Sequence, residues 1–415
     1  MIVHSSSEPK NDIAVLRELA RQYAEAASRP VQDERRAMWR GHNSFERTGV
    51  PIYIRGGVCW RELLEPSLAC EDPFYRNYEF AMRTDLLRDS LDDDTVLDPW
   101  ITVRAEHILP GGSIWGLDHR HIPPAEPGGA WRNDPPIETE ADIEKLTVPE
   151  HRIDEEATRR KVERMQDAIG DLVTINVSRA PAWLMWTGDI CTELGHLRGI
   201  EQAMYDMMDR PEWLHRLLAF MRDGILKAHA EAEAAGDWRL ADHQNQSMPY
   251  SRELRDPQAN SEPVTRKDLW GYCAAQELTL VSPAMHEEFM LQYQRPILER
   301  FGLSAYGCCE DLTHKIDMVR SIGNLRRIAV TPRADVRKSA EQIGEDYVIS
   351  WRPNPAETVC CGFDESRVRT LIREGLAACR GLHVDISMKD IQTVEGDVDR
   401  FRQFIRVVRE ETEGW

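Results

Sequence analysis

The chain has 415 residues, of which 71 are acidic and 52 are basic, so its formal net charge is −19. This charge argues against binding to nucleic acid or to anionic membranes, because both reward clusters of Lys and Arg. The chain has no apolar run near the roughly 20 residues that span a bilayer, and residues 1–10 lack the pattern of a secretion signal. We therefore expect a cytoplasmic protein with a small-molecule substrate.

Eight short apolar or β-branched runs predict β-strands, each followed by polar residues, Gly or Pro. They cover residues 50–55, 100–103, 172–177, 238–242, 304–308, 325–330, 347–351 and 382–386. Strands that alternate with helices favour a parallel sheet, and eight of them favour a closed (β/α)8 TIM barrel. The early connections are long, and one of them, 123–136, is a proline-rich segment that we interpret as a surface loop.

Amphipathic helices are predicted between the strands. The clearest covers 211–235, with Pro211 in the first turn and Gly236 just past the end. Another begins at Ser282-Pro283 and runs to about residue 300, and a last one follows Asp397. Residues 1–48 form a predicted N-terminal helical extension, and 49–415 form the single barrel domain.

The most informative motif follows the predicted strand 304–308 and reads Tyr-Gly-Cys-Cys-Glu-Asp over residues 306–311. Thiolate and carboxylate groups both bind borderline-soft cations such as zinc, so Cys308, Cys309 and Glu310 are candidate metal ligands. The alternative is that Cys308 packs as a small apolar residue and Glu310 caps the next element. Nine cysteines, an odd number, do not suggest a disulfide framework in a chain of this length.

From about residue 137 onward the chain resembles the uroporphyrinogen decarboxylase superfamily. The resemblance rests on several stretches in the same order, among them "IETEADIEKLTVPE", "GIEQAMYDMMDRPEWLHRLL", "VSPAMHEEFMLQYQRPILERF", "SAYGCCEDLTHKI" and "HVDISMKDIQTVEGD". It implies a (β/α)8 barrel. The closest branch in character is that of the zinc-dependent corrinoid methyltransferases, which move a methyl group to or from a corrinoid protein.

In that branch, zinc is held by a His-x-Cys motif at one strand end and by a later Cys after the last strand. The first position falls on residues 306–309, where a thiol is present and the histidine is absent. The second falls near 387–389, where the cysteine is absent. The resemblance thus leaves Cys308 or Cys309 as a thiolate ligand of the zinc, and Glu310 would be a substitute ligand found in this sequence alone. His243 is the first candidate for a further ligand, or for a residue that hydrogen-bonds the substrate.

Further candidates follow the later predicted strands, because barrel enzymes place their active sites at the carboxyl ends of the strands. Arg352 could anchor a carboxylate or a phosphate, or could be a surface ion-pair partner. Lys389 and Asp390 are catalytic candidates, or a structural ion pair that closes the barrel. The run Asp118-His119-Arg120-His121 could bind a metal or form a solvated loop.

Two functions remain open. The first is a zinc-dependent methyltransferase or demethylase that acts on a small methylated or methoxylated substrate, with a corrinoid protein as methyl acceptor. The second is a metal-independent decarboxylase-type lyase that acts on a small carboxylated substrate. Decarboxylation of the tetrapyrrole itself is not expected, because the family's N-terminal arginine motif is missing and "VPIYIRGG" offers only Arg55. The oligomeric state stays open, and homodimers are common among soluble barrels.

Overall fold

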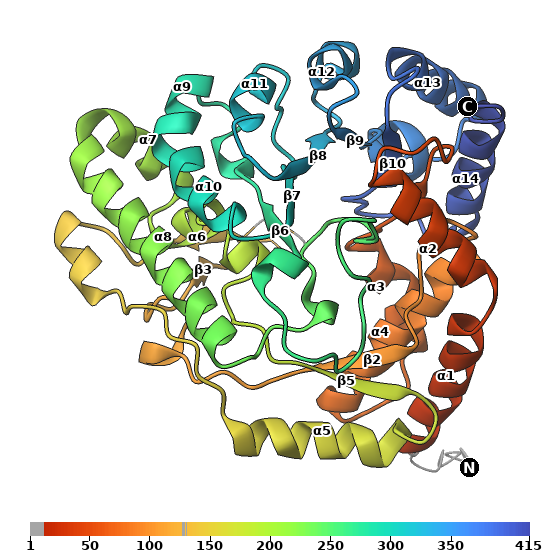
Figure 1. Cartoon of the computed structure of the whole chain (residues 1–415), viewed down its shortest axis with the longest axis horizontal. Coiled ribbons are helices and arrows are strands. Elements are labelled where there is room, and N and C mark those ends of the chain that lie inside the picture. Colours follow the sequence, from red (N-terminus) through yellow and green to blue (C-terminus); the bar gives the residue numbers. More distant parts are fainter. Residues whose placement is uncertain (1–11, 127–128, 130) are drawn as a thin grey trace.

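The computed structural model describes residues 12–126, 129 and 131–415, and the strands of its main sheet lie in the middle with helices outside them (Figure 1). The strands are β1 (Ile52–Ile54), β2 (Trp100–Arg104), β3 (Arg120–Ile122), β4 (Arg132–Asp134), β5 (Thr174–Ser178), β6 (Trp270–Cys273), β7 (Leu303–Tyr306), β8 (Leu325–Val330), β9 (Val348–Trp351) and β10 (Val384–Met388). The helices are α1 (Asp12–Ala27), α2 (Val31–His42), α3 (Cys59–Leu64), α4 (Pro73–Ser90), α5 (Glu155–Ile169), α6 (Cys191–Leu197), α7 (Ile200–Asp209), α8 (Pro211–Ala234), α9 (Pro283–His286), α10 (Gln292–Leu298), α11 (Ile316–Val319), α12 (Val336–Ile343), α13 (Glu365–Ala378) and α14 (Asp399–Glu411).

Six parallel strands form one curled sheet in the order β1-β10-β9-β8-β7-β6. Strands β2 and β5 form a separate parallel pair beside α5 (Figure 1). The fold is therefore mixed α/β with a half-barrel sheet. The expectation of a closed eight-stranded ring is corrected, since the described strands do not join into one continuous sheet.

Side chains take the place of a neighbouring strand at the free edge of β1. The backbone N–H of Ile52 donates to Asp94 Oδ2 at 2.7 Å, and that of Ile54 donates to Asp93 Oδ2 at 2.7 Å. In return, the Asp94 N–H donates to the Ile52 carbonyl at 2.8 Å. These bonds satisfy buried backbone groups that a closed barrel would satisfy with another strand.

The strand predicted at 238–242 is wrong, because this segment folds into a 3₁₀ turn at Leu240–Asp242. Asp242 Oδ2 accepts the Arg239 N–H at 2.8 Å, and Asp242 Oδ1 accepts the Ser178 hydroxyl at 2.6 Å. Such local side-chain bonds compete with strand pairing. The strand after it is β6, which the sequence pattern missed because all four of its residues are buried and show no alternation.

The other seven predicted strands and the main helices are confirmed in place. Helix α8 buries one apolar face, which comprises Leu214, Leu217, Leu218, Met221 and Ile225. The helix predicted from Ser282 is formed by α9, a π-helical stretch (Glu287–Leu291) and α10, and the Ser282 hydroxyl accepts the Met285 N–H at its start. The helices from α8 to α13 follow the curve of the sheet as an outer layer (Figure 1).

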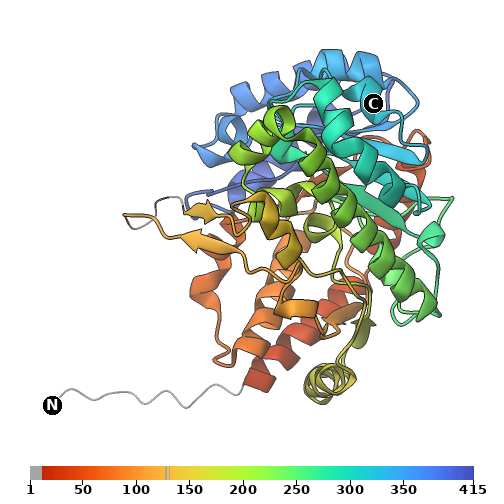
Figure 2. The ribbon, with the colours of Figure 1, turned by 90° about the vertical axis from the view of Figure 1, so that its left-hand side faces the viewer.

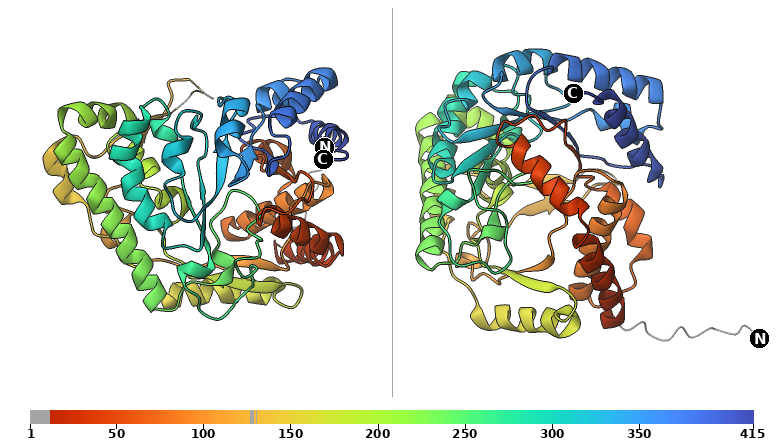
Figure 3. Two further views of the ribbon diagram at one scale, coloured as in Figure 1. Left: turned by 45° about the horizontal axis from the view of Figure 1, so that its top comes forward. Right: turned by 45° about the vertical axis from the view of Figure 1, so that its right-hand side comes forward.

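Helix α1 packs against α4 and α5, as the right-hand view of Figure 3 shows. Its buried face contains Leu16, Leu19, Ala20 and Tyr23, the residues that the helical register predicts. The first part of the predicted N-terminal extension, residues 1–11, lies outside the described residues. Within the described part of the chain, no helix is both long and apolar enough to cross a membrane.

The proline-rich segment predicted as a surface loop belongs to an antiparallel hairpin formed by β3 and β4. Figure 2 shows this hairpin projecting from the side of the body. Residues 127, 128 and 130 of the segment lie outside the described residues.

The inside of the curled sheet contains a buried ionic group. Arg327 Nη2 donates to Asp385 Oδ2 at 2.6 Å, and His42 Nε2 lies 3.2 Å from the same oxygen. The side chain of Asp385 is fully buried. These contacts tie β8, β10 and α2 together beneath the strand ends.

Candidate active site

A cavity of about 280 Å³ opens where strands β1, β7 and β10 end. Arg55 directly follows β1, Cys308 comes two residues after β7, and Lys389 directly follows β10. The carboxyl ends of parallel strands meet at one edge of a sheet, which is why residues so distant in sequence share this pocket. Its lining comprises Arg55, Gly57, Trp186, Gln276, Cys308, Cys309, Lys389 and Asp390.

The reactive centre of the pocket is a thiol held against an ammonium group. Lys389 Nζ lies 2.9 Å from the buried Cys308 Sγ and 3.5 Å from Cys309 Sγ. The two sulfur atoms are 3.4 Å apart, and Cys309 Sγ lies 3.1 Å from Asp390 Oδ2. Lys389 Nζ also pairs with Asp390 at 3.2 Å.

This arrangement separates the two thiols in acidity. The hydrogen bond from the Cys309 thiol and the charges of Lys389 and Arg352 lower the pKa of Cys308 well below its ordinary value, although burial opposes them. The same hydrogen bond, together with burial, raises the pKa of Cys309. Cys308 is therefore the more acidic thiol of the pair, and the thiolate is the nucleophilic form of cysteine.

Backbone geometry aims Cys308 into the pocket. Gly307 has φ +100°, and a Cβ atom there would lie 2.8 Å from Leu312 Cδ1, so the turn after β7 requires glycine. Glu310 stabilises this turn, since its two carboxylate oxygens accept the backbone N–H of Cys308 at 2.7 Å and that of Ala275 at 2.8 Å. Arg352 donates to the carbonyl of Cys308 on the other side.

The predicted zinc ligands do not fit a metal ion as they lie. Both carboxylate oxygens of Glu310 face backbone N–H groups, and the Lys389 ammonium occupies the cationic position beside the two sulfurs. Within the described residues, no set of three His, Cys, Asp or Glu side chains close enough to hold a cation forms at this pocket.

The structure brings together four of the predicted site residues, namely Cys308, Cys309, Lys389 and Asp390, and places Glu310 and Arg352 beside them as supports. It does not bring His243 to this group. His243 Nδ1 accepts the N–H of Trp270, the first residue of β6, at 3.1 Å, and Nε2 lies 3.2 Å from the Arg255 carbonyl. Both ring nitrogens are thus bonded to backbone at the amino end of a strand, and burial lowers the pKa of His243 to about 4.

Two lining residues, Arg55 and Gln276, are not among the predicted site residues. Arg55 lines the cavity, and its Nη1 is buried without a hydrogen-bond partner. The position of Arg55 directly after β1 is a sequence signal that could have identified it as a lining residue. Gln276 follows β6, the strand that the pattern missed.

A second cavity, of about 610 Å³, lies between α12 and α13 and is lined by Asp335, Arg352, Asn354, Arg367 and other residues of these elements. It contains none of the thiols. The Asp335 carboxylate also accepts the Lys338 N–H and so caps α12.

The chain has no match among protein-family models or among curated proteins. Among solved structures it is similar to a methyltransferase from Methanosarcina mazei, with a TM-score of 0.52 and 13% sequence identity. The similarity covers 91% of this chain and 98% of the other. At this identity the likeness shows a shared fold.

Proposed function

We propose that this protein is a methyltransferase whose Cys308 thiolate exchanges a methyl group with a small anionic substrate. The observation that carries the proposal is the contact of 2.9 Å between Cys308 Sγ and Lys389 Nζ inside the cavity. A sulfur nucleophile ionised at neutral pH suits methyl transfer, because the carbon of a methyl group is attacked by soft, electron-rich atoms. The methyltransferase fold neighbour supports this reaction class at a coarse level.

The step is a displacement at the methyl carbon. A lone pair of Cys308 Sγ forms the S–C bond, while the bond between the methyl carbon and the substrate's oxygen or nitrogen breaks and its electron pair stays on that atom. The leaving atom takes up a proton, and the Lys389 ammonium, which lies 2.9 Å from Cys308 Sγ on the cavity wall, is the proposed donor. Cysteine 308 becomes S-methylcysteine, and the substrate leaves in its demethylated form.

Substrate recognition is assigned to Arg55. Arg55 lines the cavity, and a carboxylate on the substrate would accept a charge-assisted bond from its guanidinium group. A cavity of about 280 Å³ suits a small molecule. These features favour a small methylated or methoxylated carboxylate.

A corrinoid protein is the methyl partner in this proposal, as the family resemblance implies. It would take the methyl group from Cys308 and restore the thiolate. Zinc, the other cofactor implied by the resemblance, has no part in the proposed step. Both oxygens of Glu310 accept backbone N–H groups, and the Lys389 ammonium lies beside the two sulfur atoms.

The test uses methyl iodide as a probe on the full chain at neutral pH, followed by peptide mass spectrometry. We expect Cys308 to gain a methyl group faster than Cys361, an exposed cysteine that serves as an internal control. Addition of cob(I)alamin should then remove the methyl group from Cys308. Methylation of Cys308 no faster than of Cys361 would overturn the proposal, and a methyl group that cob(I)alamin leaves in place would remove the corrinoid partner from it.

A second candidate is a lyase that decarboxylates a small acid. Arg55 and Lys389 favour it, because one could bind a carboxylate while the other protonates the carbanion left after loss of carbon dioxide. The two functions differ in their dependence on sulfur. A Cys308→Ser variant should lose methyl transfer and retain decarboxylation.

A further inference from the structure

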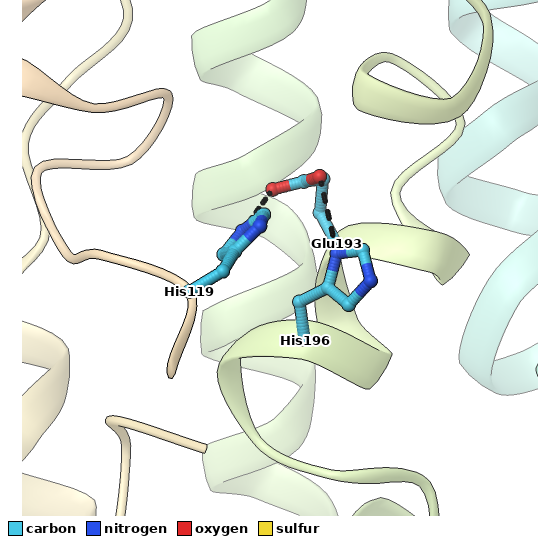
Figure 4. A group of neighbouring side chains, drawn as sticks. All are labelled: His119, Glu193 and His196. Carbon is cyan, nitrogen blue, oxygen red and sulfur yellow. Dashed lines mark hydrogen bonds and ion pairs between the residues drawn. The ribbon is translucent and has the colours of Figure 1, made fainter. Parts of the chain in front are cut away.

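A second group of side chains, away from the thiol pocket, has the composition of a metal site. It consists of His119, just before β3, and of Glu193 and His196 on α6 (Figure 4). Glu193 and His196 are three residues apart, so they share one face of the helix. His119 reaches them from the hairpin, 74 residues earlier in the chain.

The distances match those between ligands of one cation. His119 Nε2 lies 3.1 Å from Glu193 Oε2, and His196 Nδ1 lies 3.6 Å from Glu193 Oε1. All three ligand atoms lie within 4.8 Å of one another. Two ligands bound tetrahedrally at about 2.0–2.1 Å from zinc lie about 3.3 Å apart, so small shifts would complete the set.

Burial and one unsatisfied ring nitrogen distinguish this cluster from an ordinary surface ion pair. Glu193 is 1% exposed, and its ion pairs among the described residues are with these two imidazoles. His196 Nδ1 is buried and has no hydrogen-bond partner. The two imidazoles already pair with the buried Glu193 carboxylate, and a cation between the three groups would bind that carboxylate and His196 Nδ1 together.

We infer that His119, Glu193 and His196 bind one divalent first-row transition cation, with zinc as the best match. Two imidazole nitrogens and one carboxylate are a common zinc ligand set, and they leave a fourth position open. His119 is partly exposed, so water can reach that position. This site is independent of the thiol chemistry proposed above.

The ion would fasten the β3–β4 hairpin to the body of the protein. Asn133, on β4, already donates to the carbonyls of Gly195 and His196 at the end of α6, at 2.7 and 3.1 Å. A bond from the metal to His119, which directly precedes β3, would attach the other arm of the hairpin as well.

The experiment measures zinc binding by the full chain after chelator treatment, by metal analysis and by calorimetry with zinc alone. We expect one zinc ion per chain at this site. His119→Ala and Glu193→Gln should each weaken it by more than about 100-fold, since even residues that only support a ligand contribute 10–100-fold. The matched control is His121→Ala, which removes an exposed histidine of the same hairpin whose ring packs on Trp131.

Cysteines could also bind zinc, so the test has a second arm. In a Cys308→Ser, Cys309→Ser double variant the site should keep its ion, and cobalt(II) bound there should show no thiolate charge-transfer band. Zinc should raise the melting temperature of the wild type and of His121→Ala, but not of His119→Ala. Absence of zinc binding, or binding that His119→Ala and Glu193→Gln leave unchanged, would overturn the assignment.

Discussion

Replacing Lys389 by methionine tests whether its charge maintains the Cys308 thiolate. Methionine has a similar length and no charge, so the change removes the ammonium that lies 2.9 Å from Cys308 Sγ. Opposite unit charges 4 Å apart attract by about 4 kcal/mol at an effective dielectric constant of about 20. An opposite charge at such distances lowers the pKa of an acidic group by about 1–3 units.

We therefore expect Lys389→Met to raise the pKa of Cys308 by about 2 units, equivalent to about 3 kcal/mol. The shift is partial because the hydrogen bond from Cys309 and the charge of Arg352 remain. The assay is the rate of alkylation by iodoacetamide as a function of pH, with peptide mass spectrometry to separate Cys308 from Cys309. The midpoint for Cys308 should move up by about 2 pH units.

Lys389→Arg is the control for this experiment, because it keeps the positive charge and should keep the midpoint closer to that of the wild type. A Cys308 midpoint that does not change in Lys389→Met would refute the reasoning. It would mean that the short contact contributes nothing to the acidity of the thiol.

Three more outcomes are expected from buried groups. Glu310→Gln should lower the free energy of unfolding by about 1–3 kcal/mol in urea titrations, because the carboxylate accepts two backbone N–H groups. Asp385→Ala should cost about 3–5 kcal/mol in the same assay, since it leaves Arg327 buried without its counter-charge; a cost below 1 kcal/mol would contradict this. Burial lowers the pKa of His229 from 6.5 to about 4, so between these values the unfolded chain binds a proton that the native state does not, and stability falls with falling pH by up to about 3 kcal/mol. His229→Gln should make that decline shallower, and an identical pH profile would rule out the contribution.

The position of the thiol pocket could be predicted because it depends on local rules. Cys308 and Lys389 each follow a strand that the apolar pattern identifies, and parallel strands end at the same edge. The orientation of Glu310 could not be predicted in this way. Its carboxylate turns toward the N–H of Ala275, which belongs to a different strand connection, and this depends on the turn at Gly307.

The sequence pattern also misplaces His243, which it predicts as a site residue. Its place after a predicted strand at 238–242 would have put it at the carboxyl edge, but that segment is a turn, and His243 lies beside Trp270 at the opposite end of β6. Of the cluster of His119, Glu193 and His196, the sequence pattern indicates only His119. His119 was a candidate for metal binding, while its partners on α6 become neighbours through tertiary contacts alone.

The two aspartates at the free edge of β1 also bear on whether another strand can pair with this edge. An unpaired strand edge is a template onto which another polypeptide can add and so start fibrils. Asp93 and Asp94 already engage the N–H groups of Ile52 and Ile54, so an incoming strand would have to displace two buried negative charges. The β1 edge of the sheet is in this way protected from becoming a seed for aggregation.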